Sequence, residues 1–369
     1  MHARNLLLRS LRFTAAVLYG AAAITATAAD KVQDDVAVAH QPASIAVLLP
    51  IKSKSLRPAA EQIRAGIVAA EKAHGNADIP TIRLYDTGDA ETEILAQLDK
   101  ARADGARAII GPLSKSAVNY VADMAELDVP ILALNSFDDT TLPRKGLYSF
   151  SLSIEAEAAQ LARTIQEGGL NKPVLLQGEG SLAARMVQGF SSHWTRTSGN
   201  APEVIDLAEP AATPSALAEL LAARDCDAVI LATTAKQARL IRPYLGNDRL
   251  VYATSQIDTG TLKASVDLAG VRFLDMPWLA APEHDAFMAY QRKRSPSADL
   301  ERLYALGIDA WRIAASLATQ SGEKEWEGVS GWLSVGDNGQ IQRELVLRTV
   351  PGRLPASKPA DSNPTPSGQ

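Results

Sequence analysis

The segment NKPVLLQGEGSLAARMVQGF, residues 171–190, contains the local pattern that decides the fold class of this chain. It begins with a short apolar run, Pro173–Gln177, passes through the glycine-rich turn Gly178–Gly180, and continues with helical periodicity from Ser181 onward. A short apolar run that meets glycine and then an amphipathic stretch predicts a strand, a tight turn and a helix. This is one β-α unit of a parallel sheet.

The same β-α rhythm repeats on both sides of this segment. Before it, strands are expected at 44–51, 81–85, 108–110, 130–134 and 148–153, with helices at 58–73, 91–103, 116–127 and 155–167. After its own helix at 181–197, strands are expected at 203–207, 228–232, 249–254 and 271–276, with helices at 215–223 and 235–244. Strands that alternate with helices build parallel sheets covered on both faces. The sequence therefore predicts an α/β fold of two doubly wound, Rossmann-like lobes of roughly 110 to 120 residues each.

The last third of the chain contains too few elements to form a core of its own. Residues 282–293 and 300–319 have helical periodicity, and an alternating apolar pattern surrounds the hairpin turn signal Asp337–Gly339. We expect these pieces to return to the two lobes, so that the chain makes multiple crossovers between them. Lobe 1 is then 44–152 plus about 278–330, and lobe 2 is 153–277 plus about 331–350.

The N-terminus has the pattern of a secretory signal peptide, predicted over residues 1–29. Arg9 and Arg12 belong to a positive region ahead of an apolar stretch, and small residues near its end offer a cleavage site. We expect a periplasmic location for the mature chain, with residues 30–43 as a polar lead-in. The alternative is an uncleaved membrane anchor. Because no Cys lies near the cleavage site, we expect no lipid anchor there.

The composition of the chain argues against nucleic acid as a partner and excludes an intramolecular disulfide. Lys and Arg total 37 against 42 Asp and Glu, and the resulting net charge of −5 predicts that nucleic acid is not a partner. Cys226 is the only cysteine, so no intramolecular disulfide can form. Residues 351–369 are rich in Pro and Ser with almost no large apolar side chains, and we expect a disordered tail there.

Local motifs in both predicted lobes resemble those of one known family. They are IIGPL (109–113), TTAKQARLIRPYL (233–245), VYATSQI (251–257), GVRFLDMPWL (270–279), RLYALGIDAWRI (302–313) and GWLSVGDNGQIQREL (331–345). Together they closely resemble the LppC-like penicillin-binding protein activators, from about residue 44 to residue 350. The resemblance implies a type I periplasmic binding protein fold. It also implies protein–protein contact with a peptidoglycan synthase, a class A penicillin-binding protein. The alternative is a substrate-binding protein that passes an amino acid or small polar ligand to a transporter or sensor.

The turn at residues 178–183 has the outline G-x-G-x-x-A, which is also the outline of a dinucleotide-binding turn. Such a site needs an acidic residue for the ribose about 20 positions further on. Asp206 lies 28 residues beyond Gly178, within the expected strand, and the motif opens the second lobe rather than the first. We therefore expect this turn to line the cleft between the lobes, and we expect no cofactor.

Polar turns at the carboxyl ends of the strands predict where a small polar ligand would bind in that cleft. On the first lobe they are Ser114, Lys115, Ser116, Asn135 and Ser136, and on the second they are Ser181, Leu182, Thr233, Thr234, Thr254 and Ser255. Hydroxyl side chains at these positions are equally common as helix caps. For Ser114 and Ser136 the two interpretations stay open.

Nothing in the sequence predicts an enzyme. There is no H-E-x-x-H pair for zinc and no G-x-S-x-G elbow for a hydrolase, so we expect neither a metal site nor catalytic residues. Trp278 is expected to pack at a crossing between the lobes. Trp326 and Trp332 lie around the predicted hairpin, where an aromatic side chain could either anchor a partner or cover the sheet edge.

Overall fold

The computed structural model describes residues 42–138, 144–210, 212–246, 248–260, 266–290, 295 and 297–351. The predicted signal peptide, nearly all of the lead-in and the tail after residue 351 lie outside these residues. The described part belongs to one compact unit, Gln41–Gln369. None of its helices combines the length and the apolar character that a membrane-spanning helix requires.

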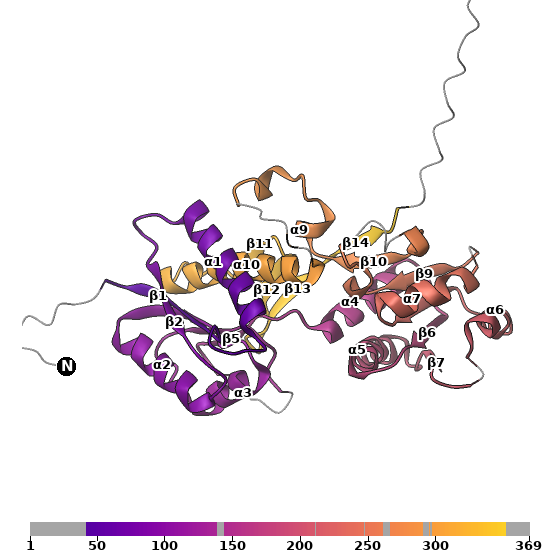
Figure 1. Cartoon of the computed structure of the whole chain (residues 1–369), viewed down its shortest axis with the longest axis horizontal. Coiled ribbons are helices and arrows are strands. Elements are labelled where there is room, and N and C mark those ends of the chain that lie inside the picture. The colour runs from indigo at the N-terminus through magenta and orange to yellow at the C-terminus, as the bar shows by residue number, and fades with distance from the viewer. Residues whose placement is uncertain are drawn as a thin grey trace, which may run out of the picture. The chain divides into compact units, whose positions relative to one another are not determined.

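The first parallel sheet, sheet A, lies in the N-terminal part of the chain (Figure 1). Its strands are β1 (Ser44–Leu49), β2 (Thr81–Asp86), β3 (Ala106–Ile110), β4 (Ile131–Ala133) and β5 (Leu147–Ser149), in the order β2-β1-β3-β4-β5. The helices between them are α1 (Arg57–His74), α2 (Glu91–Ala103) and α3 (Lys115–Met124). Every residue of β1 is buried because this interior strand has a neighbour on each side and is covered on both faces.

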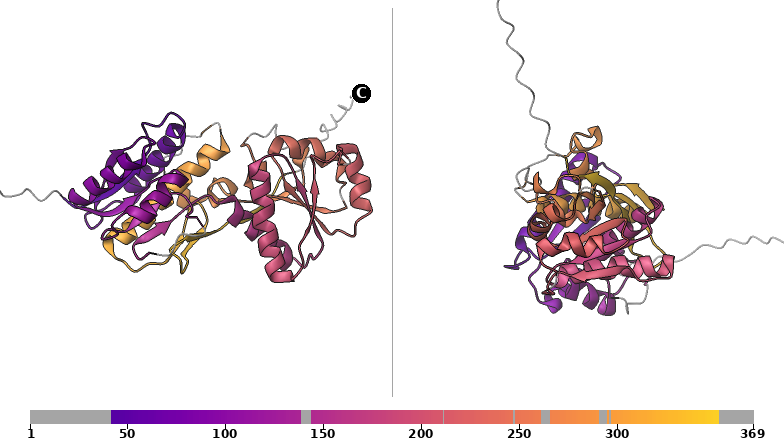
Figure 2. Two further views of the ribbon diagram at one scale, coloured as in Figure 1. Left: turned by 90° about the horizontal axis from the view of Figure 1, so that it is seen from below. Right: turned by 90° about the vertical axis from the view of Figure 1, so that its right-hand side faces the viewer.

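The second sheet, sheet B, repeats this design (Figure 2). Its strands are β6 (Pro173–Gln177), β7 (Glu203–Asp206), β8 (Ala228–Ala232), β9 (Leu250–Ala253), β10 (Arg272–Asp275) and β14 (Val346–Thr349), in the order β14-β10-β9-β8-β6-β7. Its helices are α4 (Ile154–Glu167), α5 (Ser181–Ser198), α6 (Leu217–Ala222) and α7 (Ala235–Ile241). Only β14 runs antiparallel to its neighbour. The predicted fold class, two doubly wound α/β lobes with crossovers, is confirmed.

The remaining elements lie between β10 and β14 along the chain and connect sheet A with sheet B. They are α9 (Pro277–Ala280), the long helix α10 (Ala298–Thr319), and sheet C, formed by β11 (Glu325–Glu327), β12 (Trp332–Val335) and β13 (Ile341–Glu344). Helix α10 packs against α1 so closely that Cβ atoms at Gly66 and Gly307 would lie 2.1 Å from backbone oxygens of the facing helix. The predicted hairpin is confirmed, since β12 and β13 pair on either side of Asp337–Gly339.

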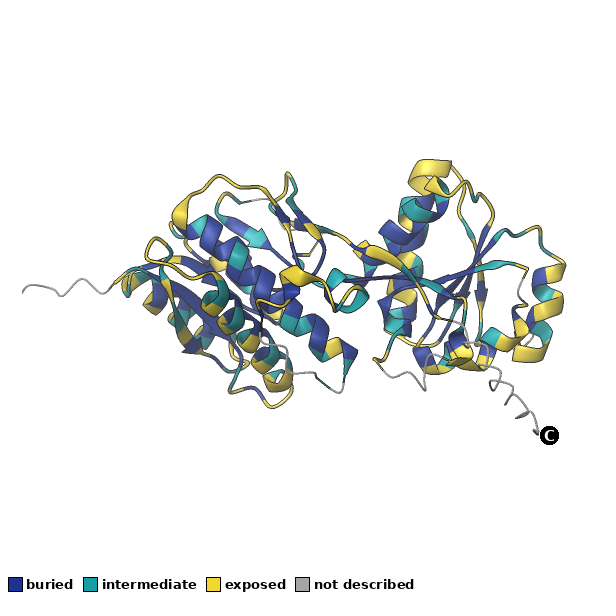
Figure 3. Cartoon of the chain, turned by 90° about the horizontal axis from the view of Figure 1, so that it is seen from above, coloured by how far each residue is buried: buried dark blue, intermediate teal, exposed yellow. Residues whose placement is uncertain are grey.

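One hydrophobic cluster extends across both parallel sheets. It includes Ile45 in β1, Leu175 in β6 and the fully buried Trp278 of α9. The burial pattern in Figure 3 follows this arrangement, with buried strands inside and exposed residues on the outer helix faces. The two sheets therefore share part of their core, although each is wound separately.

Two predictions differ from the structure. Residues 282–290 form turns and a short 3-10 helix, Asp285–Phe287, where a helix over 282–293 was expected. His284 accepts the Ala286 N–H, and Phe287 and Tyr290 turn their rings toward Trp278, which replaces helical packing.

The second difference concerns the segment 331–350, which was expected in lobe 2. Only Val346–Thr349 pairs with sheet B, whereas β12 and β13 belong to sheet C. Gln340 also forms a bridge with Ser149 of sheet A. The apolar face of the hairpin explains this position, because Leu333 and Ile341 pack into the same cluster as α10.

Candidate functional site

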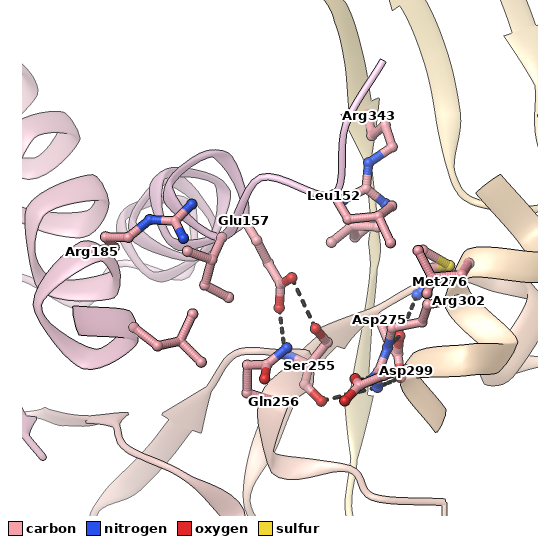
Figure 4. Close-up of a pocket in the computed structure, with 14 residues that line it drawn as sticks. Leu152, Glu157, Arg185, Ser255, Gln256, Asp275, Met276, Asp299, Arg302 and Arg343 are labelled. Carbon is pink, nitrogen blue, oxygen red and sulfur yellow. Dashed lines mark hydrogen bonds and ion pairs between the residues drawn. The ribbon is translucent and has the colours of Figure 1, made fainter. Parts of the chain in front are cut away.

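Within the described residues the chain passes three times between sheet B and the elements packed around sheet A, which include α10 and sheet C. It crosses after β5 into α4, after β10 into α9, and from β13 into β14. These crossings surround a cavity of about 240 Å³ (Figure 4). Its charged lining residues are Glu157, Arg185, Asp275, Asp299, Arg302 and Arg343, and its apolar ones are Leu152, Ile154, Leu182, Met276, Leu303 and Leu345. We take this cavity as the candidate functional site.

A buried ion pair fixes one wall of the cavity. Arg302 of α10 donates two hydrogen bonds to Asp275 at the end of β10, at 3.1 Å from Nε and 3.0 Å from Nη2. The side chain of Asp275 is fully buried and that of Arg302 is 5% exposed. Arg302 also donates to the Ser255 carbonyl oxygen at 2.9 Å. Burial alone would lower the pKa of Arg302, but the charge and hydrogen bonds of Asp275 outweigh it and raise this pKa.

The opposite wall holds a buried carboxyl. Glu157, in the first turn of α4, accepts hydrogen bonds from the backbone N–H and the hydroxyl of Ser255. In Figure 4 its carboxylate points at Ser255. Burial raises the pKa of Glu157 to about 7, although the Ser255 bonds and the nearby charge of Arg343 act in the other direction. Near neutral pH this group is therefore divided between its charged and neutral forms.

Arg343 of β13 connects the first and third crossings. Its Nε donates to the Ser151 carbonyl oxygen at 3.1 Å, and its Nη1 donates to that of Ser330 at 3.2 Å. Burial lowers the pKa of Arg343, while the charges of Glu157, Asp309 and Asp275 oppose that effect. Strand β13 thus carries an arginine that lines the cavity and donates a hydrogen bond to the segment leading into α4.

The arrangement is suited to binding and to holding the crossings in place. Groups of both signs line a small cavity with apolar patches between them, which suits a small ligand that carries both charges. The hydroxyl of Ser255 donates to Glu157, and no histidine is among the lining residues. In the described part of the chain, no cluster of three or more His, Cys, Asp or Glu could hold a metal ion.

Of the residues predicted for the cleft, the structure brings Leu182 and Ser255 to this cavity. The others lie in turns or at the first residues of the following helices, and several have local roles. Ser114 caps α3 by accepting the Ala117 N–H, Lys115 pairs with Asp138, Ser116 is exposed in α3, and Asn135 bonds to Leu113 and Ser136. Thr234 forms a capping box with Gln237, Thr254 contacts the Met186 sulfur, Thr233 is buried, and Ser181 begins α5.

The backbone conformation of the turn after β6 explains why glycine stands at position 180. Gly180 has φ +93°, a value that side-chain-bearing residues rarely adopt, and it leads directly into α5. Asp206 closes β7 rather than lying within that strand as expected, and it pairs in register with Gln177. Its carboxylate accepts the N–H of Ala208 at 2.9 Å, a local turn bond.

The charged residues of the cavity are not among the site residues predicted from the sequence. Arg302 shares a helix face with Leu306 and Ile313, and Glu157 shares one with Leu161. A charge on an otherwise apolar helix face is a signal that could have identified both residues. Asp275 had no such signal, because its partner lies 27 positions away in sequence.

A family search identifies the chain. The family described as "LppC putative lipoprotein" matches residues 19–348. The chain belongs to this family.

Two curated relatives illustrate the similarity and carry the same name. The "Penicillin-binding protein activator LpoA" of Aliivibrio fischeri is 25% identical over 83% of this chain and 56% of its own length. The protein of the same name from Klebsiella pneumoniae is 28% identical over 79% of this chain and 46% of its own length. The chain therefore spans about half the length of the curated relatives it matches.

Solved structures show the same fold. A chain from Chromobacterium violaceum, assigned to a branched-chain amino acid ABC transporter, has a TM-score of 0.72 and is 34% identical, covering 83% of this chain and 99% of that one. The C-domain of LpoA from Haemophilus influenzae, described as a regulator of PBP1A, has a TM-score of 0.70 at 21% identity. It covers 84% of this LppC-family chain and 97% of its own.

Proposed function

We propose that this LppC-family protein is a non-enzymatic periplasmic activator of peptidoglycan synthases that acts by contact with a class A penicillin-binding protein. The observation that carries the proposal is the family match over residues 19–348, with curated relatives named as penicillin-binding protein activators. The signal pattern at residues 1–29 supports a periplasmic location. The cavity supports a role in binding, because side chains of both charges line it and Arg302 and Asp275 hold each other in an ion pair.

Reconstitution tests this proposal directly. The purified mature protein is added to each class A penicillin-binding protein of the same organism, and the rates of glycan polymerisation and crosslinking are measured. We expect at least one of these rates to rise for at least one synthase. Heat-unfolded protein serves as the control. Unchanged rates for every synthase would refute the proposed function.

A second candidate function has its own support. The cavity is lined by both positively and negatively charged side chains. In addition, the solved structure that is 34% identical to this chain is assigned to a branched-chain amino acid ABC transporter. As a small-molecule receptor, this protein would be stabilised by about 2.7 kcal/mol by a ligand at 100 times its dissociation constant. Thermal unfolding in the presence of amino acids and cell-wall fragments tests this, and such a ligand would raise Tm by roughly 4 °C. Arg302→Met, which removes a charged side chain from the lining of the cavity, should abolish this rise in Tm.

A further inference from the structure

Sheet C has two faces of opposite character. The inner face carries Trp326 and Leu333, which are 4% and 0% exposed, and it packs into the shared core. The outer face carries Trp332, whose exposed fraction is 50%. The four other tryptophans of the chain are at most 4% exposed, so Trp332 is the one indole that the fold does not use for its core.

Carboxylates flank this indole on both sides. In the strand register Trp332 lies directly opposite Glu327 of β11 and Glu344 of β13, and Glu325 follows on the same face. All three glutamates are exposed. Directly opposed residues have Cβ atoms roughly 4.5–5.5 Å apart, so Glu327 and Glu344 are the nearest cross-strand neighbours of Trp332 on this face. Glu344 is paired with Arg163, whereas Glu325 and Glu327 form no ion pair with the other described residues.

The backbone beneath Trp332 is held firmly. Asp309 of α10 is fully buried and accepts bonds from the N–H groups of Val329 and Ser330 at 3.1 and 2.7 Å. It also accepts the Ser330 hydroxyl at 2.6 Å. Gly331 has φ +147°, and a Cβ there would lie 2.7 Å from the Glu344 carbonyl oxygen. The turn that positions Trp332 is therefore preorganised, which lowers the entropy lost when a partner binds.

We propose that this outer face, formed by Glu325, Glu327, Trp332 and Glu344, docks a basic segment of a partner protein. A lysine or arginine side chain of that segment would lie over the indole between the two carboxylates. Cations are attracted to the face of a tryptophan ring, and flanking carboxylates add charge complementarity. An exposed aromatic residue on a rigid support is also typical of the residues that dominate binding energy. The outer face would then be the surface by which this protein contacts a synthase, and that assignment rests on the function proposed above.

The first test measures the affinity of the full mature protein for its class A synthases. Trp332→Ala should weaken binding by about thirtyfold, as expected for a central interface residue. The double variant Glu325→Gln/Glu327→Gln should weaken it by about tenfold at low salt and less at 0.15 M, where the Debye length is about 8 Å. Matched controls are Tyr244→Ala, an aromatic residue 43% exposed elsewhere, and Glu209→Gln/Glu219→Gln. Affinities equal to wild type in both test variants would overturn the proposal, while the synthase function would stand.

The second test uses the same protein without a synthase. Its indole N–H signals are followed by NMR during titration with a short peptide of alternating lysine and serine. The signal assigned to Trp332 by Trp332→Phe should shift saturably, and a glutamate–serine peptide should leave it unchanged. If wild type binds no synthase, the proposed function fails and this titration decides the docking surface. A shift confined to Trp332 then supports the surface, and no shift overturns it.

Discussion

At the scale of single residues, burial sets the protonation state of Glu157. The folded chain keeps a proton on this carboxyl up to about pH 7, whereas the ordinary pKa of the group is 4.5. Between these values the folded state binds more protons than the unfolded state. The free energy of unfolding therefore falls as pH rises through this window, and a pKa shift of this size corresponds to about 3 kcal/mol.

Glu157→Gln should remove this pH dependence. The amide stays neutral and can still accept one of the two bonds from Ser255. Relative to wild type, the variant should gain up to about 3 kcal/mol of stability between pH 5 and pH 8. Urea unfolding at intervals across this range measures the difference, with the exposed Glu219→Gln as control. A difference that does not change with pH would show that Glu157 ionises normally.

At the scale of elements, the Arg302–Asp275 pair attaches helix α10 to the end of β10. Removing Arg302 leaves the buried Asp275 carboxylate with the longer contact to Arg348 at 3.7 Å, and breaking a buried pair in this way costs about 3–5 kcal/mol. We therefore expect Arg302→Met to lower the free energy of unfolding by that amount. Adding Asp275→Asn should recover part of the loss, because the stranded charge disappears.

An exposed ion pair provides the control for these two variants. Arg239 and Asp267 are 3.3 Å apart with side chains 41% and 51% exposed. Exposed pairs contribute about 0–1 kcal/mol, so Arg239→Met should have little effect in the same denaturant titration. Equal losses at the two sites would contradict the assigned role of the buried pair.

The contact between α1 and α10 depends on glycine. A Cβ at position 307 would lie 2.1 Å from the Ile63 carbonyl oxygen. Alanine is favoured over glycine in a helix interior by about 1 kcal/mol, yet we expect Gly307→Ala to destabilise by about 1–3 kcal/mol because the helices must separate. Thermal unfolding measures the change. Gly168→Ala, at the end of α4 with negative φ, is the control and should be nearly neutral.

The sequence predicts elements well where one local pattern determines them. Residues 91–103 form a helix as expected, and the expected helix at 300–319 is observed as Ala298–Thr319, because their apolar spacing repeats over several turns. The pattern fails at 282–290, where aromatic contacts with Trp278 replace a helical face. Such contacts depend on residues distant in sequence, so local periodicity cannot reveal them.

The candidate site was less predictable for the same reason. Hydroxyl residues at strand ends include Ser255, which lines the cavity, but the same residue types also cap helices, as Ser114 and Thr234 do. The cavity is made by pairs such as Arg302 with Asp275 and Glu157 with Ser255, separated by 27 and 98 residues. Only the arrangement of the crossings brings these partners together.

At the scale of the whole molecule, the two wound sheets are expected to unfold together. Each sheet alone resembles an independent domain, and separate unfolding transitions would follow if each had its own core. The shared cluster joins Ile110 of sheet A to Ile230 of sheet B, and the buried Arg302–Asp275 pair connects their elements. Loss of either sheet would expose this common core, so the cost of partial unfolding is high.

Hydrogen exchange in increasing urea tests this cooperativity. Peptides covering β3 and β8 report the two sheets separately, and in wild type their protection should disappear at the same urea concentration. In Arg302→Met the two midpoints should separate, because the charged link between α10 and β10 is lost while each sheet keeps its own strands. The matched variant Arg239→Met should keep a single midpoint. Two midpoints in the wild-type protein would mean that the shared cluster does not couple the sheets, and that the crossings act as linkers alone.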